Sequence, residues 1–96
     1  MMSTTSSLPV THNAAESRFE VAVDGALAVM EYARAGTTLA ITHTFVPTTL
    51  RGRGLAEALM KAAISFAQAE RLAIDPVCSY AARYLEKHPT RTQGTA

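Results

Sequence analysis

The chain has 96 residues, 48% of them hydrophobic, and a formal net charge of +1. This length fits one domain with a modest core, and the apolar content argues against wholesale disorder. The near-neutral charge excludes a broad electrostatic field directed at nucleic acid or at an anionic membrane. Any anion must therefore be bound locally.

The chain has one cysteine, Cys78. An internal disulfide is impossible, which favours a reducing compartment. No apolar run approaches the ~20 residues that span a bilayer, and residues 1–17 lack the charged start and apolar centre of a secretory signal. We therefore expect a cytoplasmic protein without nucleic-acid or membrane partners.

Three strands are predicted in the first half of the chain. Arg18–Val23 alternates polar and apolar residues, the period-two pattern of a half-buried strand. Asp24-Gly25 is a two-residue hairpin turn, because glycine accepts positive φ without steric cost. Ala26–Arg34 is the expected second strand of this hairpin. After a second turn, Thr37–Val46 is the expected third strand, because it is rich in β-branched residues. Together these strands predict an antiparallel meander.

A long amphipathic helix follows, from about Gly54 to Glu70-Arg71. Its apolar residues recur at the helical spacing i, i+3, i+4, i+7 and so form one core-facing stripe. The stripe consists of Leu55, Ala58, Leu59, Ala62, Ala63, Phe66 and Ala67.

Leu72–Asp75 is a short strand candidate, and the strand–helix–strand order implies a parallel pair. Ser79 is the expected N-cap of a second helix that runs to Lys87 and is stopped by Pro89. The predicted fold class is α+β. We expect a flexible N-terminus over 1–16, in which residues 8–15 could add an edge segment, one domain over 17–90 and a tail over 91–96.

A basic, glycine-rich turn, Val46–Ala56, joins the third strand to the long helix. A helix N-terminus offers unpaired N–H groups and partial positive charge, so it favours anions. Gly52 and Gly54 leave the backbone accessible, while Arg51 and Arg53 can pair with phosphate oxygens. The turn therefore predicts a phosphate-binding site.

Known phosphate loops narrow this prediction. The Gly-Lys-Ser/Thr of a Walker loop and the third glycine of a dinucleotide fingerprint are both missing. The coenzyme A loop Arg/Gln-x-x-Gly-x-Gly/Ala is matched by Arg51, Gly54 and Ala56. Two alternatives remain: a basic loop whose glycines only turn the chain, and a DNA-binding Arg-Gly-Arg segment, which lacks flanking basic residues.

Four blocks in order carry a family resemblance: His43–Pro47, Leu50–Ala56, Pro76–Tyr80 and His88-Pro89. With them the chain resembles the small GNAT-like N-acetyltransferase domain proteins, minimal members of the GCN5-related acetyltransferase family, over residues 19–89. The resemblance implies a minimal GNAT-like fold: the meander, the coenzyme A-loop helix, a short parallel strand and a C-terminal helix.

The resemblance implies acetyl-coenzyme A as co-substrate and no metal. The pyrophosphate would lie on the amides of Arg51–Ala56, and the pantetheine arm beside Phe45 and Val46. The acetyl group would lie between that strand and the strand leading into Pro76. The implied coenzyme-binding residues are Phe45, Val46, Arg51, Gly52, Arg53, Gly54, Leu55, Ala56, Tyr84 and His88.

Acetyl transfer needs a base for the amine and a proton for the leaving thiolate. His43 could be the base, but it is expected to share a strand face with Leu39, Ile41 and Phe45, so a structural role is an alternative. A structural role is also the alternative for each of the other candidate residues. Cys78 could accept the acetyl group or be a small buried side chain.

Tyr80 or Tyr84 could protonate the thiolate or simply pack in the core. His88 either ends the second helix or meets a phosphate or the adenine. The implied acceptor is an amine, of a small molecule or of a protein, whose identity the sequence leaves open.

Three functions are compatible with these observations. The first is an N-acetyltransferase that works by direct attack of an amine on acetyl-coenzyme A. The second is a non-catalytic acyl-coenzyme A-binding or interaction module, because larger GNAT domains add a strand and two helices to the acceptor site. The third is a small nucleic-acid-binding protein that relies on Arg51 and Arg53. We expect a monomer or a weak homodimer.

Overall fold

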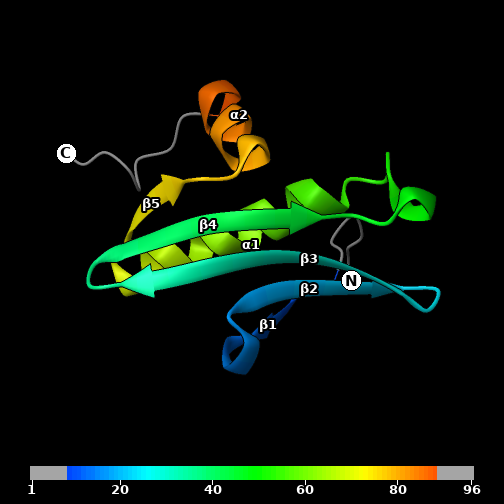
Figure 1. Cartoon of the computed structure of the whole chain (residues 1–96), viewed down its shortest axis with the longest axis horizontal. Coiled ribbons are helices and arrows are strands. Elements are labelled where there is room, and N and C mark those ends of the chain that lie inside the picture. The colour runs from blue at the N-terminus through cyan, green and yellow to red at the C-terminus, as the bar shows by residue number, and fades with distance from the viewer. Residues whose placement is uncertain (1–8, 89–96) are drawn as a thin grey trace, which may run out of the picture.

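A five-stranded sheet and two α-helices make up residues 9–88, the part of the chain that the computed structural model describes (Figure 1). The elements are β1 (Thr11–Asn13), β2 (Arg18–Val23), β3 (Ala26–Ala35), β4 (Thr38–Phe45), α1 (Leu55–Glu70), β5 (Ala73–Pro76) and α2 (Ser79–Lys87). The strands follow one another in the sheet in chain order. Within this described range, no helix has both the length and the apolar content that crossing a membrane requires.

The structure confirms the predicted antiparallel meander and the predicted parallel pairing of the short strand after the long helix. β2, β3 and β4 pair antiparallel, and β5 pairs parallel with β4 after the crossover through α1. At the first hairpin, Asp24 and Gly25 have φ values of 51° and 80°. Two successive left-handed residues are the backbone of the tight hairpin turn that an Asp-Gly pair favours.

The sheet begins earlier than residue 17. β1 pairs antiparallel with β2 and sets His12 opposite Phe19. The His12 ring stacks on Phe19 with centroids 4.3 Å apart, and its Nε2 lies 2.6 Å from the Tyr32 hydroxyl. Residues 11–16, expected in the flexible N-terminus, thus take part in the fold. Residues 1–8 and 89–96 lie outside the described part, and with them Pro89 and the expected tail.

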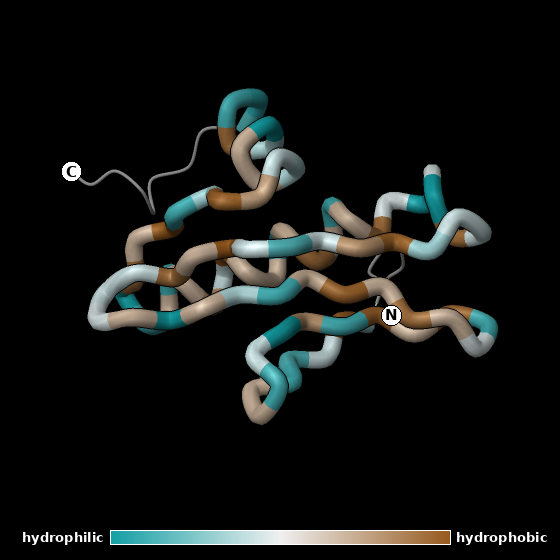
Figure 2. Tube along the Cα trace, viewed as in Figure 1, coloured by the Kyte–Doolittle hydropathy of each residue, from teal (hydrophilic) through white to brown (hydrophobic). Residues whose placement is uncertain are grey.

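One face of the sheet carries the core. Helix α1 lies behind the sheet in Figure 1, while no helix formed by residues 9–88 covers the face toward the viewer, which we call the open face. The buried side chains are Phe19, Val21, Ala28, Met30, Tyr32, Leu39, Ile41, Leu50, Leu55, Leu59, Met60, Ala63, Ala67, Leu72, Ile74, Ala81 and Leu85. Helix α2 is largely hydrophilic along its length (Figure 2), and only Ala81 and Leu85 of this helix are buried in the core.

A β-bulge interrupts β4. Tyr32 pairs with Ile41 and Glu31 pairs with His43, so Thr42 is an extra residue without a partner in this register. The extra residue reverses the faces of the rest of β4. Thr44 then pairs with buried Met30 on the helix side. The expectation that His43 shares a face with Leu39 and Ile41 is therefore wrong: His43 lies on the open face.

Helix α2 begins with a different cap from the one expected. Cys78, not Ser79, is the N-cap, and its Sγ accepts the backbone N–H of Ala81 at 3.4 Å. Cys78 has an extended backbone (φ −79°, ψ 151°) that suits an N-cap, whereas Ser79 is already helical. The predicted C-terminal end at Lys87 is confirmed, and His88 donates its N–H to the carbonyl of Tyr84 at 2.8 Å.

Candidate functional site

The segment between β4 and α1 is anchored by one apolar side chain. Thr48–Leu50 forms a single turn of 3₁₀-helix, in which Leu50 donates its N–H to the carbonyl of Pro47 at 2.8 Å. The Leu50 side chain is 2% exposed and belongs to the core. Burial of this leucine fixes the start of the glycine-rich turn relative to the sheet, so the turn is held by the same core that holds α1.

Two glycines in left-handed conformations shape the rest of the turn. Gly52 has φ 82° and Gly54 has φ 78°. No heavy atom lies within 4 Å of the position a Cβ would take on either residue. Glycine is favoured at both positions because the left-handed conformation costs other residues about 1–2 kcal/mol. Steric crowding of a side chain by neighbouring atoms is not the reason.

The N-terminus of α1 has free donors. Gly54 is its N-cap without a capping side chain, and the first helical bond is from Ala58 N–H to the carbonyl of Gly54 at 3.0 Å. Among residues 9–88, no hydrogen bond engages the amides of residues 52–57. A run of free amides at the positive end of a helix dipole fits an anion.

The two arginines of the turn differ in position. Arg51 donates from Nε to the carbonyl of Val46 at 3.1 Å, which holds its guanidinium over the end of β4. Arg53 extends toward the β2–β3 hairpin, where Nη1 lies 4.0 Å from Asp24 Oδ2. Both partners of this second pair are exposed, so the pair adds little stability and leaves Arg53 free to turn toward a bound anion.

A shallow cavity of about 220 Å³, which we call the loop cavity, opens at the turn. Its lining residues are Val46, Leu50, Arg51, Gly52, Gly54, Leu55, Ala56, Glu57 and Tyr80. Arg53 is outside this lining. The cavity therefore joins the end of β4, the free amides of α1 and the first turn of α2, three segments that are distant in sequence.

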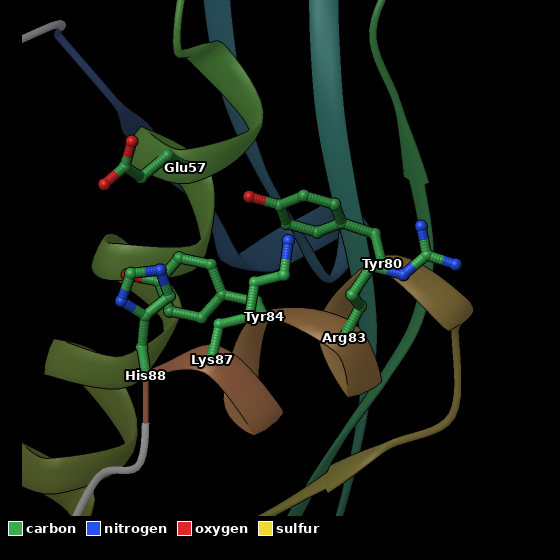
Figure 3. A pocket seen from close by; sticks show the side chains of 6 residues that line it. All are labelled: Glu57, Tyr80, Arg83, Tyr84, Lys87 and His88. Carbon is green, nitrogen blue, oxygen red and sulfur yellow. The ribbon is translucent and has the colours of Figure 1, made fainter.

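A second cavity of about 190 Å³ adjoins the first and lies between α1 and α2. We call it the interhelix groove. It is lined by Glu57, Tyr80, Arg83, Tyr84, Lys87 and His88 (Figure 3). Glu57 and Tyr80 line both cavities, which are therefore neighbours. The rings of Tyr84 and His88 stack at a centroid distance of 4.4 Å.

Strands β4 and β5 part beside the loop cavity. Their pairing ends where Ile41 meets Pro76, and the N–H of Cys78 adds one bond to the carbonyl of Ile41 at 2.9 Å. Beyond that point, the edge of β4 turned away from β3 has no partner strand in the described part of the chain. At this fork the Cys78 Sγ lies 3.5 Å from the Thr44 hydroxyl.

The structure brings together most, but not all, of the predicted site residues. Val46, Tyr80 and most of residues 51–56 line the loop cavity, and Tyr84 and His88 line the adjoining groove. Phe45 is 47% exposed and pairs with Val29 on the open face. His43 and Phe45 therefore project from the face of β4 opposite the two cavities.

Tyr80 is the titratable candidate with a perturbed acidity. It is half-buried, and this burial raises the pKa of its hydroxyl above the ordinary value of 10.0. The neighbouring Tyr84, Glu57 and Cys78 raise this pKa further, because each disfavours a phenolate. Tyr80 therefore keeps its proton at neutral pH and can donate it.

Some residues at the site escaped prediction. Leu50 and Glu57 line the loop cavity, Thr44 contacts Cys78, and Arg83 and Lys87 line the groove. Arg83 and Lys87 are four apart and so share a helix face, which was a usable signal. Thr44 could not be placed, because its orientation depends on the bulge. Among the described residues, no group of three His, Cys, Asp or Glu side chains is placed to hold a metal ion.

The chain is similar to known proteins along most of its length. A family model described as GCN5-related N-acetyl-transferase matches residues 18–93. Protein NATD1 of Xenopus tropicalis is 36% identical over 91 residues, which cover 92% of this chain and 84% of that protein. Protein NATD1 of Homo sapiens is 35% identical over 83 residues, which cover 83% of this chain and 74% of that protein.

A solved structure shares the fold. A GCN5-like protein of Staphylococcus aureus, determined by NMR in solution, superposes with a TM-score of 0.67 at 32% sequence identity. The match covers 86% of this chain and 82% of the bacterial one. The arrangement of strands, turn and helices described above is therefore shared with a GCN5-like protein.

Proposed function

The chain belongs to the GCN5-related N-acetyltransferase family, and from this membership we propose that it binds acetyl-coenzyme A and transfers the acetyl group to an amine by direct attack. The observation that carries the proposal is the set of free amides at residues 52–57, opened by two left-handed glycines and flanked by Arg51. This cradle fits a pyrophosphate, which needs several donors and positive charge.

The remaining coenzyme contacts follow from the direction of β4. From Val46 to Ile41 the strand runs for about 17 Å, with one edge free beyond the fork. We expect the pantetheine arm to lie along this edge and to bring the thioester toward Thr44 and Cys78. Bound acetyl-coenzyme A supplies a thioester whose carbonyl carbon an amine can attack.

Side chains around the fork would donate a proton to the leaving thiolate and accept a proton from the attacking amine. Tyr80 holds its proton at neutral pH and lies near enough to Cys78 for that residue to raise its pKa, so its hydroxyl would donate the proton to the departing thiolate sulfur at the fork. His43 projects from the other face of β4, next to the bulge. It could accept the amine proton there only if the amine approaches from the open face. A water molecule is the other candidate base.

Calorimetric titration with acetyl-coenzyme A tests the binding step. The wild-type chain should bind, and Gly54→Glu should not, because the substitution adds strain and a negative charge to the cradle. Asp24→Asn is the matched control: it removes an exposed carboxylate near Arg53 and should leave binding intact. A folded wild-type chain that fails to bind acetyl-coenzyme A would refute the proposal.

The second candidate is a non-catalytic acyl-coenzyme A-binding module. It is favoured by one observation: His43, a candidate base, projects from the face of β4 opposite the loop cavity and the interhelix groove. Incubation with labelled acetyl-coenzyme A and a panel of amines separates the two. Turnover excludes the binding module, whereas acetylated Cys78 without onward transfer excludes an efficient enzyme.

A further inference from the structure

Apolar side chains lie exposed on the open face of the sheet. Leu27 is 39% exposed and Phe45 is 47% exposed. Phe45 pairs with Val29 of β3, and Leu27, two residues before Val29, pairs with Ala22 of β2. The residues of β3 that alternate with Leu27 and Val29 are buried, so these side chains point away from the core. We call Ala22, Leu27, Val29 and Phe45 the apolar patch. A contiguous patch of this kind marks a contact surface, whereas scattered apolar side chains do not.

Carboxylates accompany the apolar patch on this face. Glu20 pairs with Val29 from the side of β2, and Glu31 follows Val29 by two residues in β3. Asp75 lies on the same face of the sheet, because it alternates with Ile74, which is buried in the core on the helix side. The carboxylates therefore extend from β2 to β5 across the open face.

The charge that the strands place on the open face is negative. Arg18 is the one lysine or arginine of the described strands on this face, because Arg34 points to the helix side and pairs with Glu70 of α1. The Nε of Arg18 lies 2.6 Å from Glu20 Oε2, so its charge is already paired. His43 also lies on this face. With histidine counted as neutral, three carboxylates face one guanidinium there, although the whole chain has a charge of +1.

We propose that the open face is a docking surface for a basic polypeptide segment that carries an apolar side chain between two cations. The inference goes beyond the proposed function, because this face lies on the opposite side of the sheet from the loop cavity and the interhelix groove. The sign of the charge selects the partner. A second copy of the chain would bring like carboxylates together, and an anionic lipid surface or a nucleic acid would also be repelled.

The width of this surface favours a polypeptide segment over a small amine. Neighbouring strands lie about 4.8 Å apart, so the face is about 14 Å wide from β2 to β5. An extended segment of about five residues spans a similar distance, and its first, third and fifth side chains point to one side. The third would lie on Phe45 and Val29, since aromatic side chains are favoured at the centre of interfaces. The long flexible cations on either side of it would reach Glu31 and Asp75.

The test is fluorescence anisotropy of a labelled peptide with the core sequence Lys-Ser-Phe-Ser-Lys, titrated with the full chain in the absence of coenzyme. The wild type should bind this peptide, and raised salt should weaken the binding, because exposed charges are screened. Lys-Ser-Ser-Ser-Lys, which lacks the apolar side chain, should bind about tenfold more weakly. Glu-Ser-Phe-Ser-Glu, in which the charge is reversed, should bind more weakly still.

Two variants of the open face separate its contributions. Glu31→Gln/Asp75→Asn should weaken binding of the Lys-Ser-Phe-Ser-Lys peptide about fivefold, because two exposed charge pairs are lost. Phe45→Ser should weaken it about tenfold through the lost apolar contact. Leu27→Ser is measured if Phe45→Ser does not fold, and should have a smaller effect of the same sign. Glu70→Gln is the matched control: it removes a carboxylate of α1, behind the sheet, and should bind as the wild type does.

Other occupants of the open face would give different results. A folded wild type that does not bind the Lys-Ser-Phe-Ser-Lys peptide, or binding that survives in both variants, overturns the proposal. A dimer of the wild type in sedimentation velocity that Phe45→Ser abolishes would assign the face to a second copy, and phosphatidylserine vesicles that bind the wild type but not Phe45→Ser would assign it to a membrane. Either result also overturns the proposal. None of these measurements involves acetyl-coenzyme A, so the proposed function stands or falls separately.

Discussion

Gly54 has two separable tasks at the candidate site. Its left-handed backbone reverses the chain into α1, and its missing side chain leaves the first amides of the helix open. The first task concerns stability and the second concerns the ligand. A pair of matched substitutions can separate them.

Gly54→Ala should lose about 1–2 kcal/mol of unfolding free energy through backbone strain, and should also weaken acetyl-coenzyme A binding because the strain displaces the cradle. Gly36→Ala is the control. Gly36 also has a positive φ, 59°, and open space around its Cβ position, but it lies in the β3–β4 turn at the far end of β4. Urea denaturation and calorimetry on both variants check this, and equal binding by the two contradicts the role assigned to Gly54.

Tyr80 has a raised pKa with burial as its first cause. An acid whose pKa is raised on folding contributes stability that is fully present below its unfolded pKa, near 10. That contribution is lost as the pH rises through the folded pKa. Ultraviolet titration should therefore detect tyrosinates that form above pH 10 in the wild type, and Tyr80→Phe should lose one of them, while Tyr32, whose pKa burial also raises, should still contribute.

Tyr80→Phe should also test the proton transfer. We expect acetyl-coenzyme A affinity to change little and the transfer rate to fall by about 10²-fold, at the lower end of what a general acid supplies. Tyr84→Phe, one helical turn away, is the control and should retain the rate. Unchanged transfer in Tyr80→Phe would assign the proton donation to another group.

Within β4, a single extra residue decides what the strand presents to each side. Because of the bulge at Thr42, Thr44 reaches Cys78 on the helix side while His43 and Phe45 face outward. Bulges are common where a strand must aim a side chain at a site. The fork between β4 and β5 opens at the same level of the strand.

Deletion of Thr42 should remove the bulge but leave the faces of β4 unchanged, because His43 then follows Ile41 directly and still pairs with Glu31 on the open face. Because no side chain is forced across the sheet, the free energy of unfolding should fall by less than the roughly 1–3 kcal/mol that burial of an imidazole without a partner costs; urea denaturation measures this. Thr42→Ala is the control, because it keeps the bulge and loses only the hydroxyl bond to the Glu31 carbonyl at 3.2 Å. A deletion variant that unfolds at much lower urea than Thr42→Ala would mean that the bulge itself, and not only the faces that it sets, is needed for stability.

At the scale of the molecule, one core holds both helices against one face of the sheet. The loop cavity includes the end of β4 and the starts of both helices, so a ligand there is linked to global stability. Acetyl-coenzyme A at one hundred times its dissociation constant should add about 2.7 kcal/mol. For a chain of this size, that raises Tm by about 10–20 °C.

A thermal melt with and without acetyl-coenzyme A measures this shift, and Gly54→Glu should show none. The same melts with free coenzyme A tell whether the acetyl group matters for binding. A shift of similar size in the variant would locate the ligand away from the glycine-rich turn. If acetyl-coenzyme A does not change the Tm of the wild type, the result would contradict the proposed binding, as would the absence of binding in the calorimetric titration.

The amino-acid sequence by itself determined the elements whose signals are local. The alternation in β2, the Asp-Gly turn, helix α1 and the glycine-rich turn each depend on neighbours within a few residues, and all are confirmed in the structure. The buried face of α1 is wider than the predicted stripe, because Met60 is also fully buried. The family resemblance followed from the same short blocks, and the comparisons confirm it.

The tertiary structure alone decided the features that depend on distant partners. The bulge at Thr42 is a relation between two strands, so no pattern in β4 could reveal that His43 faces outward. The three-residue strand β1 is too short for a period, and its place depends on the His12 contacts with Phe19 and Tyr32. The interhelix groove exists because packing brings Glu57 of α1 next to α2, and such proximity is a property of the folded core that local sequence does not encode.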